Sequence, residues 1–270
     1  MKLKSLFVVV FAVCFLLPIY SCDDDGDVAP VFSIEHDIKL GQETVEAIKA
    51  DSVQFPILDP VKYSKSYAYL RGILNKVLAS NKIKYRDRFG YQEIKIIRRD
   101  DVLNAFCTPG GYIFVYTGLI KYLDSEDHLA GVLGHEIAHA EERHSSSQLQ
   151  KQLGVQFLLS IVLGKGSESD VVKLLGNLLA LKFSRNDEYE ADENSVEYLA
   201  GSGYQCNGTA GFFQKIESQG GGARVPEFLS THPNPGNRIQ RINEKVAKIG
   251  CSTTPSNTIQ SYKEFKASLP

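Results

Sequence analysis

The apolar positions of this chain change their spacing twice along its length. In "HDIKLGQETVEAIKAD" and "SYAYLRGILNKVLASN" they recur every three or four residues, which predicts two amphipathic helices. Between Tyr91 and Gly118 the stretches "YQEIKIIRR" and "YIFVYT" are rich in β-branched and aromatic residues, and "TPGG" between them supplies turn residues. We therefore expect a small antiparallel sheet in this part of the chain.

The helical spacing returns at Asp124. Asp124 or Ser125 can cap a helix whose first turn carries Glu126 and Asp127, and this helix is expected to run through His144. Two further helical stretches follow, "QLQKQLGVQFLLSIVLG" and "SDVVKLLGNLLALKF". The apolar run in the first is too short to span a bilayer, so it is expected to pack on the core or to shield a site. The predicted class is α+β and mostly helical, with a small antiparallel sheet.

The N-terminus has the pattern of an export signal. Two lysines precede "LFVVVFAVCFLLPIY", a run of about 15 residues, which is shorter than the roughly 20 needed to span a membrane. Removal is therefore favoured over retention as an anchor. Cys22, just after the run, resembles the lipid-modified cysteine of bacterial lipoproteins, although Tyr20 departs from that pattern. We expect a signal peptide over residues 1–21, a lipidated acidic tether over 22–32, and a protein held at the outer membrane of the cell envelope.

Composition narrows the class of protein further. With 270 residues, 43% hydrophobic and 23% charged, the chain can bury a substantial core, and its formal charge of −2 argues against nucleic acid as a partner.

Export also permits a disulfide. Beyond Cys22 the thiols are Cys107, Cys206 and Cys251, of which the last two are the preferred pair; three free thiols are the alternative.

The stretch "HEIAH" carries the clearest chemistry. His135 and His139 are four residues apart on a predicted helix, so both imidazoles lie on one face and can bind one metal ion. Glu136 projects beside that face, where it can take a proton from the attacking water. A chance match to this short motif is the alternative.

Zinc normally takes a third protein ligand. Metzincins supply it from a glycine and a histidine that would fall at positions 142 and 145, where this chain has Glu142 and Ser145. The third ligand must therefore come from a distant segment.

The best candidate segment is "NDEYEADENSVEYL". Glu188 and Asp192 are four residues apart and share a helix face, so one can bind the metal while the other accepts a hydrogen bond from a ligand imidazole. Asp187 and Glu190 are competing ligands, and a solvated acidic helix is the plain alternative.

Four motifs in order make a more specific pattern: "HEIAH", "ERH" ending at His144, "SRxxExEAD" over 184–192, and "STHPNPGNRI" over 230–239. Together they resemble the zinc peptidase family that includes the CAAX prenyl proteases, HtpX and BepA, over roughly residues 60 to 248. The resemblance implies a compact gluzincin fold in which an active-site helix lies beside a small sheet. It makes residues 33–250 a zinc metallopeptidase domain and leaves 251–270 as a C-terminal tail.

The resemblance also implies roles for single residues. His135, His139 and Glu188 would bind one Zn²⁺, Glu136 would be the general base, and Asp192 would hold a ligand imidazole.

Two further histidines follow from the same comparison. His232 would lie on or near the metal, where it either closes the open position and silences the enzyme or moves away to stabilise the oxyanion. The alternative for His232 is a helix-start histidine fixed by Pro233. His144 is interpreted as structural.

Asn104, Ala105 and Phe106 would form an edge strand that pairs with the substrate backbone. Ordinary sheet packing is the alternative for Phe106, and the Cys107 side chain could face either the cleft or the core.

These features predict a zinc-dependent metalloendopeptidase that hydrolyses peptide bonds in cell-envelope proteins, in protein quality control. Its expected partners are a polypeptide substrate and, through the lipid on Cys22, a membrane. The alternatives are a zinc-containing chaperone or binding lipoprotein without proteolytic activity, and an enzyme latched by His232.

Overall fold

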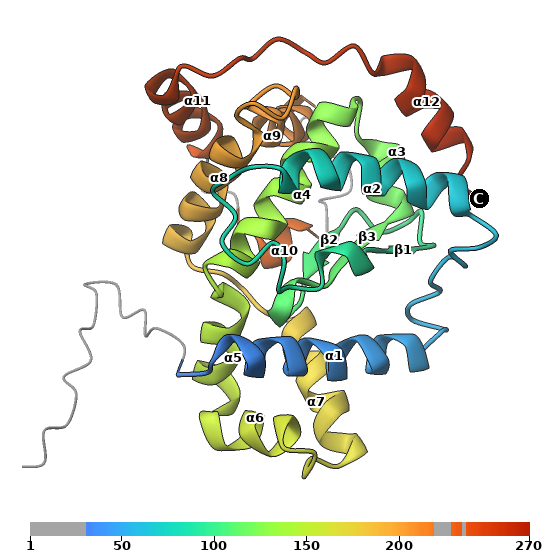
Figure 1. Ribbon diagram of the computed structural model, residues 1–270, viewed down its shortest axis with the longest axis vertical. Coiled ribbons are helices and arrows are strands. Elements are labelled where there is room, and N and C mark those ends of the chain that lie inside the picture. Colours follow the sequence, from blue (N-terminus) through green and yellow to red (C-terminus); the bar gives the residue numbers. More distant parts are fainter. Residues whose placement is uncertain (1–30, 219–227, 234–235) are drawn as a thin grey trace, which may run out of the picture.

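The computed structural model of the protein describes residues 31–218, 228–233 and 236–270 (Figure 1). The predicted signal peptide and Cys22 lie outside the described residues. The helices are α1 (Ile34–Ala50), α2 (Ser64–Leu78), α3 (Thr117–Tyr122), α4 (Glu126–Glu141), α5 (His144–Leu153), α6 (Val155–Val162), α7 (Glu168–Leu179), α8 (Arg185–Leu199), α9 (Gly208–Ser218), α10 (Phe228–Thr231), α11 (Arg238–Ile249) and α12 (Ile259–Ala267). The strands are β1 (Lys95–Ile97), β2 (Ala105–Cys107) and β3 (Ile113–Tyr116). The mostly helical α+β class is confirmed, and none of the described helices combines the length and apolarity needed to cross a membrane.

Helix α4 runs through the centre of the main core. The Ser125 side chain caps its start by accepting the His128 N–H at 3.2 Å, as predicted. Nearly every residue of the helix is buried, between α8, α9 and β2. Gly131 lets α9 approach closely, because a Cβ at this position would lie only 2.2 Å from the backbone nitrogen of Thr209.

The expected continuation of this helix to His144 is wrong. Helix α4 ends at Glu141, and Arg143 adopts a left-handed conformation with φ 61° before α5 begins. This conformation is uncommon for a residue other than glycine. The Arg143 guanidinium donates to the Asp37 carboxylate and to the carbonyl of Phe32, so contacts with the N-terminal segment hold the turn in place.

The sheet has the strand order β1-β3-β2. Strands β2 and β3 are antiparallel and are joined through the turn at Pro109–Gly111, whereas β1 runs parallel to β3. The prediction of an antiparallel sheet is therefore wrong for β1. The reason is that β1 forms no hairpin with β2, the next strand in the chain, and instead pairs with the far edge of β3. Strand β2 is left at the edge of the sheet, beside α4.

A second apolar cluster forms a lobe below the main core in Figure 1, built by α1, α5, α6 and α7. Its buried residues include Leu40 from α1, Leu149 from α5, Leu158 from α6 and Leu174 from α7. The predicted helical stretch 148–164 thus packs in a core, and it is divided into α5 and α6 at Gly154, whose φ is 80°.

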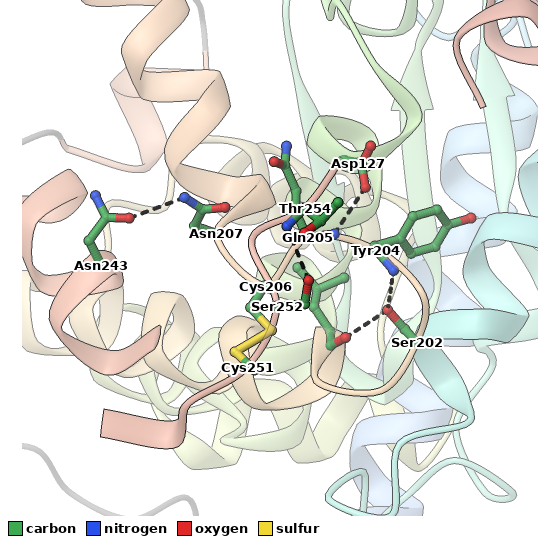
Figure 2. The surroundings of a disulfide bond; sticks show 11 residues. Asp127, Ser202, Tyr204, Gln205, Cys206, Asn207, Asn243, Cys251, Ser252 and Thr254 are labelled. Carbon is green, nitrogen blue, oxygen red and sulfur yellow. Dashed lines mark hydrogen bonds between the residues drawn. A yellow bond between two sulfur atoms is a disulfide. The ribbon is translucent and has the colours of Figure 1, made fainter. Parts of the chain in front are cut away.

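The C-terminal segment is packed against the main core. Cys206 and Cys251 form a disulfide, which confirms the preferred pair, and Figure 2 places it beside the segment that carries Ser252. The carbonyl of Ser252 accepts the N–H of Cys206 at 2.8 Å. Farther along, Tyr262 and Phe265 of α12 are buried. Residues 251–270, set apart above as a tail, therefore share the core of the preceding domain.

Candidate metal centre and active site

Two histidines of α4 and a glutamate of α8 meet in the interior. The Nε2 atoms of His135 and His139 lie 3.0 Å apart. Opposite them, Glu188 places Oε1 3.4 Å from His139 Nε2 and Oε2 3.6 Å from His135 Nε2. His232 adds its Nδ1 3.2 Å from His135 Nε2. These four buried side chains form a group that could hold a metal ion, and it contains all three of the predicted ligands.

The first turn of α8 determines which carboxylate faces the histidines. The Ser184 hydroxyl accepts the N–H of Asp187 at 3.1 Å, and the Asp187 carboxylate accepts the N–H of Ser184 at 2.9 Å. This reciprocal cap occupies Asp187. Glu190 is half-exposed and lies 3.2 Å from His144 Nε2. Both competing carboxylates therefore have other partners, and Glu188 is the one that reaches the imidazoles.

Hydrogen-bond partners assign the proton on His135. Burial lowers the pKa of His135, so its imidazole is neutral at neutral pH. Its Nδ1 lies 3.0 Å from Asp192 Oδ1, a carboxylate that can only accept. The proton therefore sits on Nδ1, and Nε2 presents a lone pair to the site. Asp192 thus occupies the position expected for it.

The proton on His139 is assigned through His144. Burial and the neighbouring His135 lower the pKa of His139 well below its ordinary value. The two Nδ1 atoms of His139 and His144 lie 2.9 Å apart, and His144 Nε2 faces Glu190. In the tautomer whose Nε2–H donates to Glu190, His144 Nδ1 accepts from His139 Nδ1–H, which leaves a lone pair on His139 Nε2. His144, interpreted above as only structural, therefore orients a candidate ligand.

The converging atoms fit zinc. Two imidazoles and a carboxylate are a donor set that zinc takes, and atoms bonded at about 2.0–2.1 Å in a tetrahedron lie about 3.3 Å apart. The two Nε2 atoms are 3.0 Å apart, and Glu188 approaches His139 Nε2 to 3.4 Å through Oε1 and His135 Nε2 to 3.6 Å through Oε2. The two Nε2 lone pairs face each other 3.0 Å apart, and a cation bound by both removes their repulsion.

Arg238 is a site residue to which the sequence assigned no role. Its guanidinium is fully buried and donates to Asp192 at 2.6 and 2.7 Å, and its Nη1 lies 2.6 Å from Glu188 Oε2. Burial by itself would raise the pKa of Glu188, but the charges of His232 and Arg238 hold it well below its ordinary value. Arg238 was visible only as the next-to-last residue of the fourth motif, because its partner Asp192 lies 46 residues away in the chain.

Glu136 lies next to this group without belonging to it. Its side chain is buried, and burial raises its pKa to about 7. The backbone N–H of Cys107 donates to its carboxylate. Among the described residues its Oε1 has no hydrogen-bond partner, and His232 Nε2 is 3.6 Å from it. Glu136 therefore presents an available acceptor beside the candidate metal ligands.

His232 follows α10 and does not start a helix, because the N-cap of α11 is Asn237; the helix-start alternative is wrong. Its Nδ1 lies 3.0 Å from Glu188 Oε1, and the Phe228 ring stacks on it at 4.2 Å. Burial lowers the pKa of His232, but Glu188 and Glu136 outweigh burial and raise it. His232 thus sits among the candidate ligands.

Strand β2 borders the site at the edge of the sheet. Ala105 is paired with Val115 of β3, and Asn104 precedes the strand with a buried side chain. The Phe106 ring stacks on Phe114 at 4.9 Å, so it does take part in sheet packing. The Cys107 thiol is buried in the main core and also lines the cavity next to Glu136. A role of residues 104–106 in binding substrate remains a prediction.

Comparison with known proteins assigns this arrangement to a family. A profile of peptidase family M48 matches residues 64–246, which include all the residues of the site. The chain belongs to peptidase family M48. The family resemblance drawn from the four motifs is thereby confirmed.

Several curated proteins are similar to this chain over part of their own length. The mitochondrial metalloendopeptidase OMA1 of Arabidopsis thaliana is 36% identical over 173 residues, covering 64% of this chain and 34% of its own length. The beta-barrel assembly-enhancing protease of Yersinia pestis is 27% identical over 238 residues, covering 83% of this chain and 47% of its own. The Escherichia coli K12 protein of the same name is 32% identical over 163 residues, covering 56% and 34%. The chain thus spans between a third and a half of the length of these relatives.

Proposed function

We propose that the protein is a zinc-dependent metalloendopeptidase. The observation that carries the proposal is the convergence of two imidazole lone pairs and the Glu188 carboxylate beside the unpartnered oxygen of Glu136. His135, His139 and Glu188 would hold the metal ion. When bound there, zinc supplies Lewis acidity, which polarises a peptide carbonyl and acidifies water.

The residues of the chain supply the rest of the chemistry. Glu136 accepts the proton of the attacking water and delivers it to the leaving amine, a task for which it has an acceptor oxygen facing the site. Asp192 and His144 keep the imidazole protons on Nδ1, so that both Nε2 atoms face inward. Arg238 offsets the charge of the two buried carboxylates that surround the histidines.

The test compares the wild type with Glu136→Gln. The variant should retain one equivalent of zinc and lose hydrolysis of a denatured protein substrate by about 10²- to 10⁴-fold, the usual contribution of a general base. Glu142→Gln, at the partly buried C-cap of the same helix, is the matched control and should keep its activity. Equal cleavage by pure wild type and Glu136→Gln would refute the peptidase. Zinc binding with no cleavage by either, and none by His232→Ala, would favour the chaperone or binding protein.

A latched resting state is a second candidate for the same site. Its support is the position of His232, whose Nδ1 lies within 3.2 Å of both His135 Nε2 and Glu188 Oε1 and so takes the place that a substrate would need. His232→Ala should then cleave faster than the wild type, and the double variant with Glu136→Gln should not cleave. A slower His232→Ala enzyme would instead favour a role in stabilising the oxyanion.

We further propose that the protein acts in the cell envelope, anchored through a lipid on Cys22, on envelope proteins in quality control. The export pattern of residues 1–21 supports this location, and the name of the Yersinia relative supports this class of substrate. Full-length protein expressed in a Gram-negative host should enter the detergent phase on phase partition, and Cys22→Ser should enter the aqueous phase. Equal partition of the two would refute the anchor.

A further inference from the structure

A small cavity opens directly beside Glu136. One wall comes from strand β2 and the residue before it, through Asn104, Phe106 and Cys107. The other comes from the end of α7 and the residues after it, through Leu178, Leu179 and Leu181. The cavity is therefore bounded on one side by the general base and on another by the strand at the sheet edge.

The lining of this cavity is mostly apolar. Glu136 and His232 are the only charged or readily charged side chains among the described residues that line it, because burial raises the pKa of the Cys107 thiol well above its ordinary value. A charged substrate side chain facing the leucines would lose its hydration without gaining a partner. An aliphatic or aromatic side chain would instead bury its surface favourably. The cavity thus favours apolar substrate side chains over charged ones.

Two buried acceptors at the cavity point to a peptide as the ligand. Asn104 Oδ1 and Glu136 Oε1 both line it, and neither has a hydrogen-bond partner among the described residues. Buried acceptors are normally paired, so these two can take N–H groups from a bound chain. In an extended peptide every second side chain points to the same face, which would bring one of them over the cavity.

We propose that this cavity is a specificity subsite that receives one aliphatic or aromatic side chain of a polypeptide next to the bond to be cleaved. The proposal rests on the proposed peptidase function, because it assigns the substrate preference of that same site.

One leucine of the wall is placed to adjust to the substrate. The cavity has a volume of about 30 Å³, room for about two water molecules and less than a leucine side chain needs. Leu178 and Leu181 are buried in the lobe formed by α1, α5, α6 and α7. Leu179 is only partly buried. Leu179 therefore turns outward when a substrate side chain enters. Its substitution should change which substrate side chains bind, without exposing the apolar core of the lobe.

The test measures binding and hydrolysis separately. Fluorescent extended peptides that differ at one position, carrying Leu, Phe, Glu or Lys, are titrated into zinc-loaded Glu136→Gln protein, which should bind them without cleaving them. The Leu and Phe peptides should bind about 10- to 200-fold more tightly than the Glu peptide, the range expected for an apolar pocket. Adding Leu179→Lys should reduce this preference at least tenfold. Leu163→Lys is the matched control, since Leu163 is an exposed leucine at the end of α6 outside the cavity, and it should leave the preference unchanged.

The outcomes separate the subsite from the peptidase. Equal binding of all four peptides, or equal effects of Leu179→Lys and Leu163→Lys, would overturn the subsite. Cleavage of the same peptides by the wild type without a side-chain preference would also overturn the subsite and keep the peptidase. Binding with the expected preference, but no cleavage by the wild type or by His232→Ala, would keep the subsite and overturn the peptidase.

Discussion

The two ends of α4 both bury polar side chains but surround them with different partners. At the N-terminal end, Glu126 accepts hydrogen bonds from two tyrosine hydroxyls, and Asp127 accepts two backbone N–H groups and a serine hydroxyl. At the other end, His135 and His139 turn lone pairs toward each other and toward Glu188. The first cluster has a donor for each carboxylate, whereas the second sets the Nε2 atoms of the two imidazoles 3.0 Å apart and brings a carboxylate against them.

This difference separates a structural cluster from a binding site. A buried acceptor that lacks a donor costs free energy, and native proteins keep few of them. The helix dipole adds to the contrast, because its positive end stabilises Glu126 and Asp127 and its negative end favours a cation near His139 in the last turn. We therefore expect substitutions at the first end to change stability alone, and substitutions at the second end to change metal binding.

The largest effect is expected for Arg238→Met. Removing the guanidinium leaves Glu188 and Asp192 buried without their shared cation, which should lower the free energy of unfolding by about 3–5 kcal/mol in the presence of a chelator. Added zinc should restore part of the loss, because it neutralises Glu188. Urea unfolding with and without zinc measures both effects.

Arg241→Met is the matched control on the same helix. The Arg241 pair with Glu193 is partly exposed, so the change should cost less than about 1 kcal/mol. Similar losses for the two arginines would contradict the role given to Arg238.

The next effect is expected when Cys206 and Cys251 are both replaced by Ser. Their disulfide closes a span of 45 residues beside the N-terminal end of α4, and its loss should cost about 3 kcal/mol of stability. Zinc affinity should remain that of the wild type, because neither residue contacts the metal group. Reduced zinc affinity in the folded variant would show that the two ends of α4 are coupled.

Local signals explain which parts of the fold were predictable. Three features were predicted: the Ser125 cap, the helical spacing of apolar residues in α1 and α2, and the Cys206–Cys251 disulfide. The first two depend on residues that are neighbours in the sequence, and the third required a choice among only three cysteines. The left-handed Arg143 was missed, since its conformation depends on Asp37, which lies 106 residues away. The parallel pairing of β1 was missed because a strand of three residues carries no sign of its partner.

The residues of the site also fall into those that the sequence could predict and those that it could not. The spacing of His135, Glu136 and His139 was sufficient to place them on one helix face. Spacing alone could not choose Glu188 over Asp187, although the Ser184-x-x-Asp187 pattern of a helix cap was a usable signal. The tasks of His144 and Arg238 could not be predicted, because they follow from how α5 and α11 pack against the α4 and α8 helices.

A smaller effect is expected for Asp127→Ala. The backbone N–H groups of Gln205 and Ser256 would lose their shared acceptor, which should cost about 2 kcal/mol of stability. Thermal unfolding gives the loss, and zinc titration should give the wild-type affinity. A weaker affinity for zinc would contradict the assignment of this cluster to structure alone.

The smallest effect, and the most specific, is expected for His144→Phe. Without the acceptor at His144 Nδ1, the proton of His139 is free to move to Nε2, where it competes with the metal. We expect zinc affinity to fall about tenfold, the lower end of the usual range, because an imidazole nitrogen orients a ligand less strongly than a carboxylate does. Competition with a chromophoric chelator measures the affinity, and Glu190→Gln, which retains His144, should change it less. An unchanged affinity in His144→Phe would mean that the stacking of Phe183 on His139 at 4.0 Å is sufficient to hold the ligand.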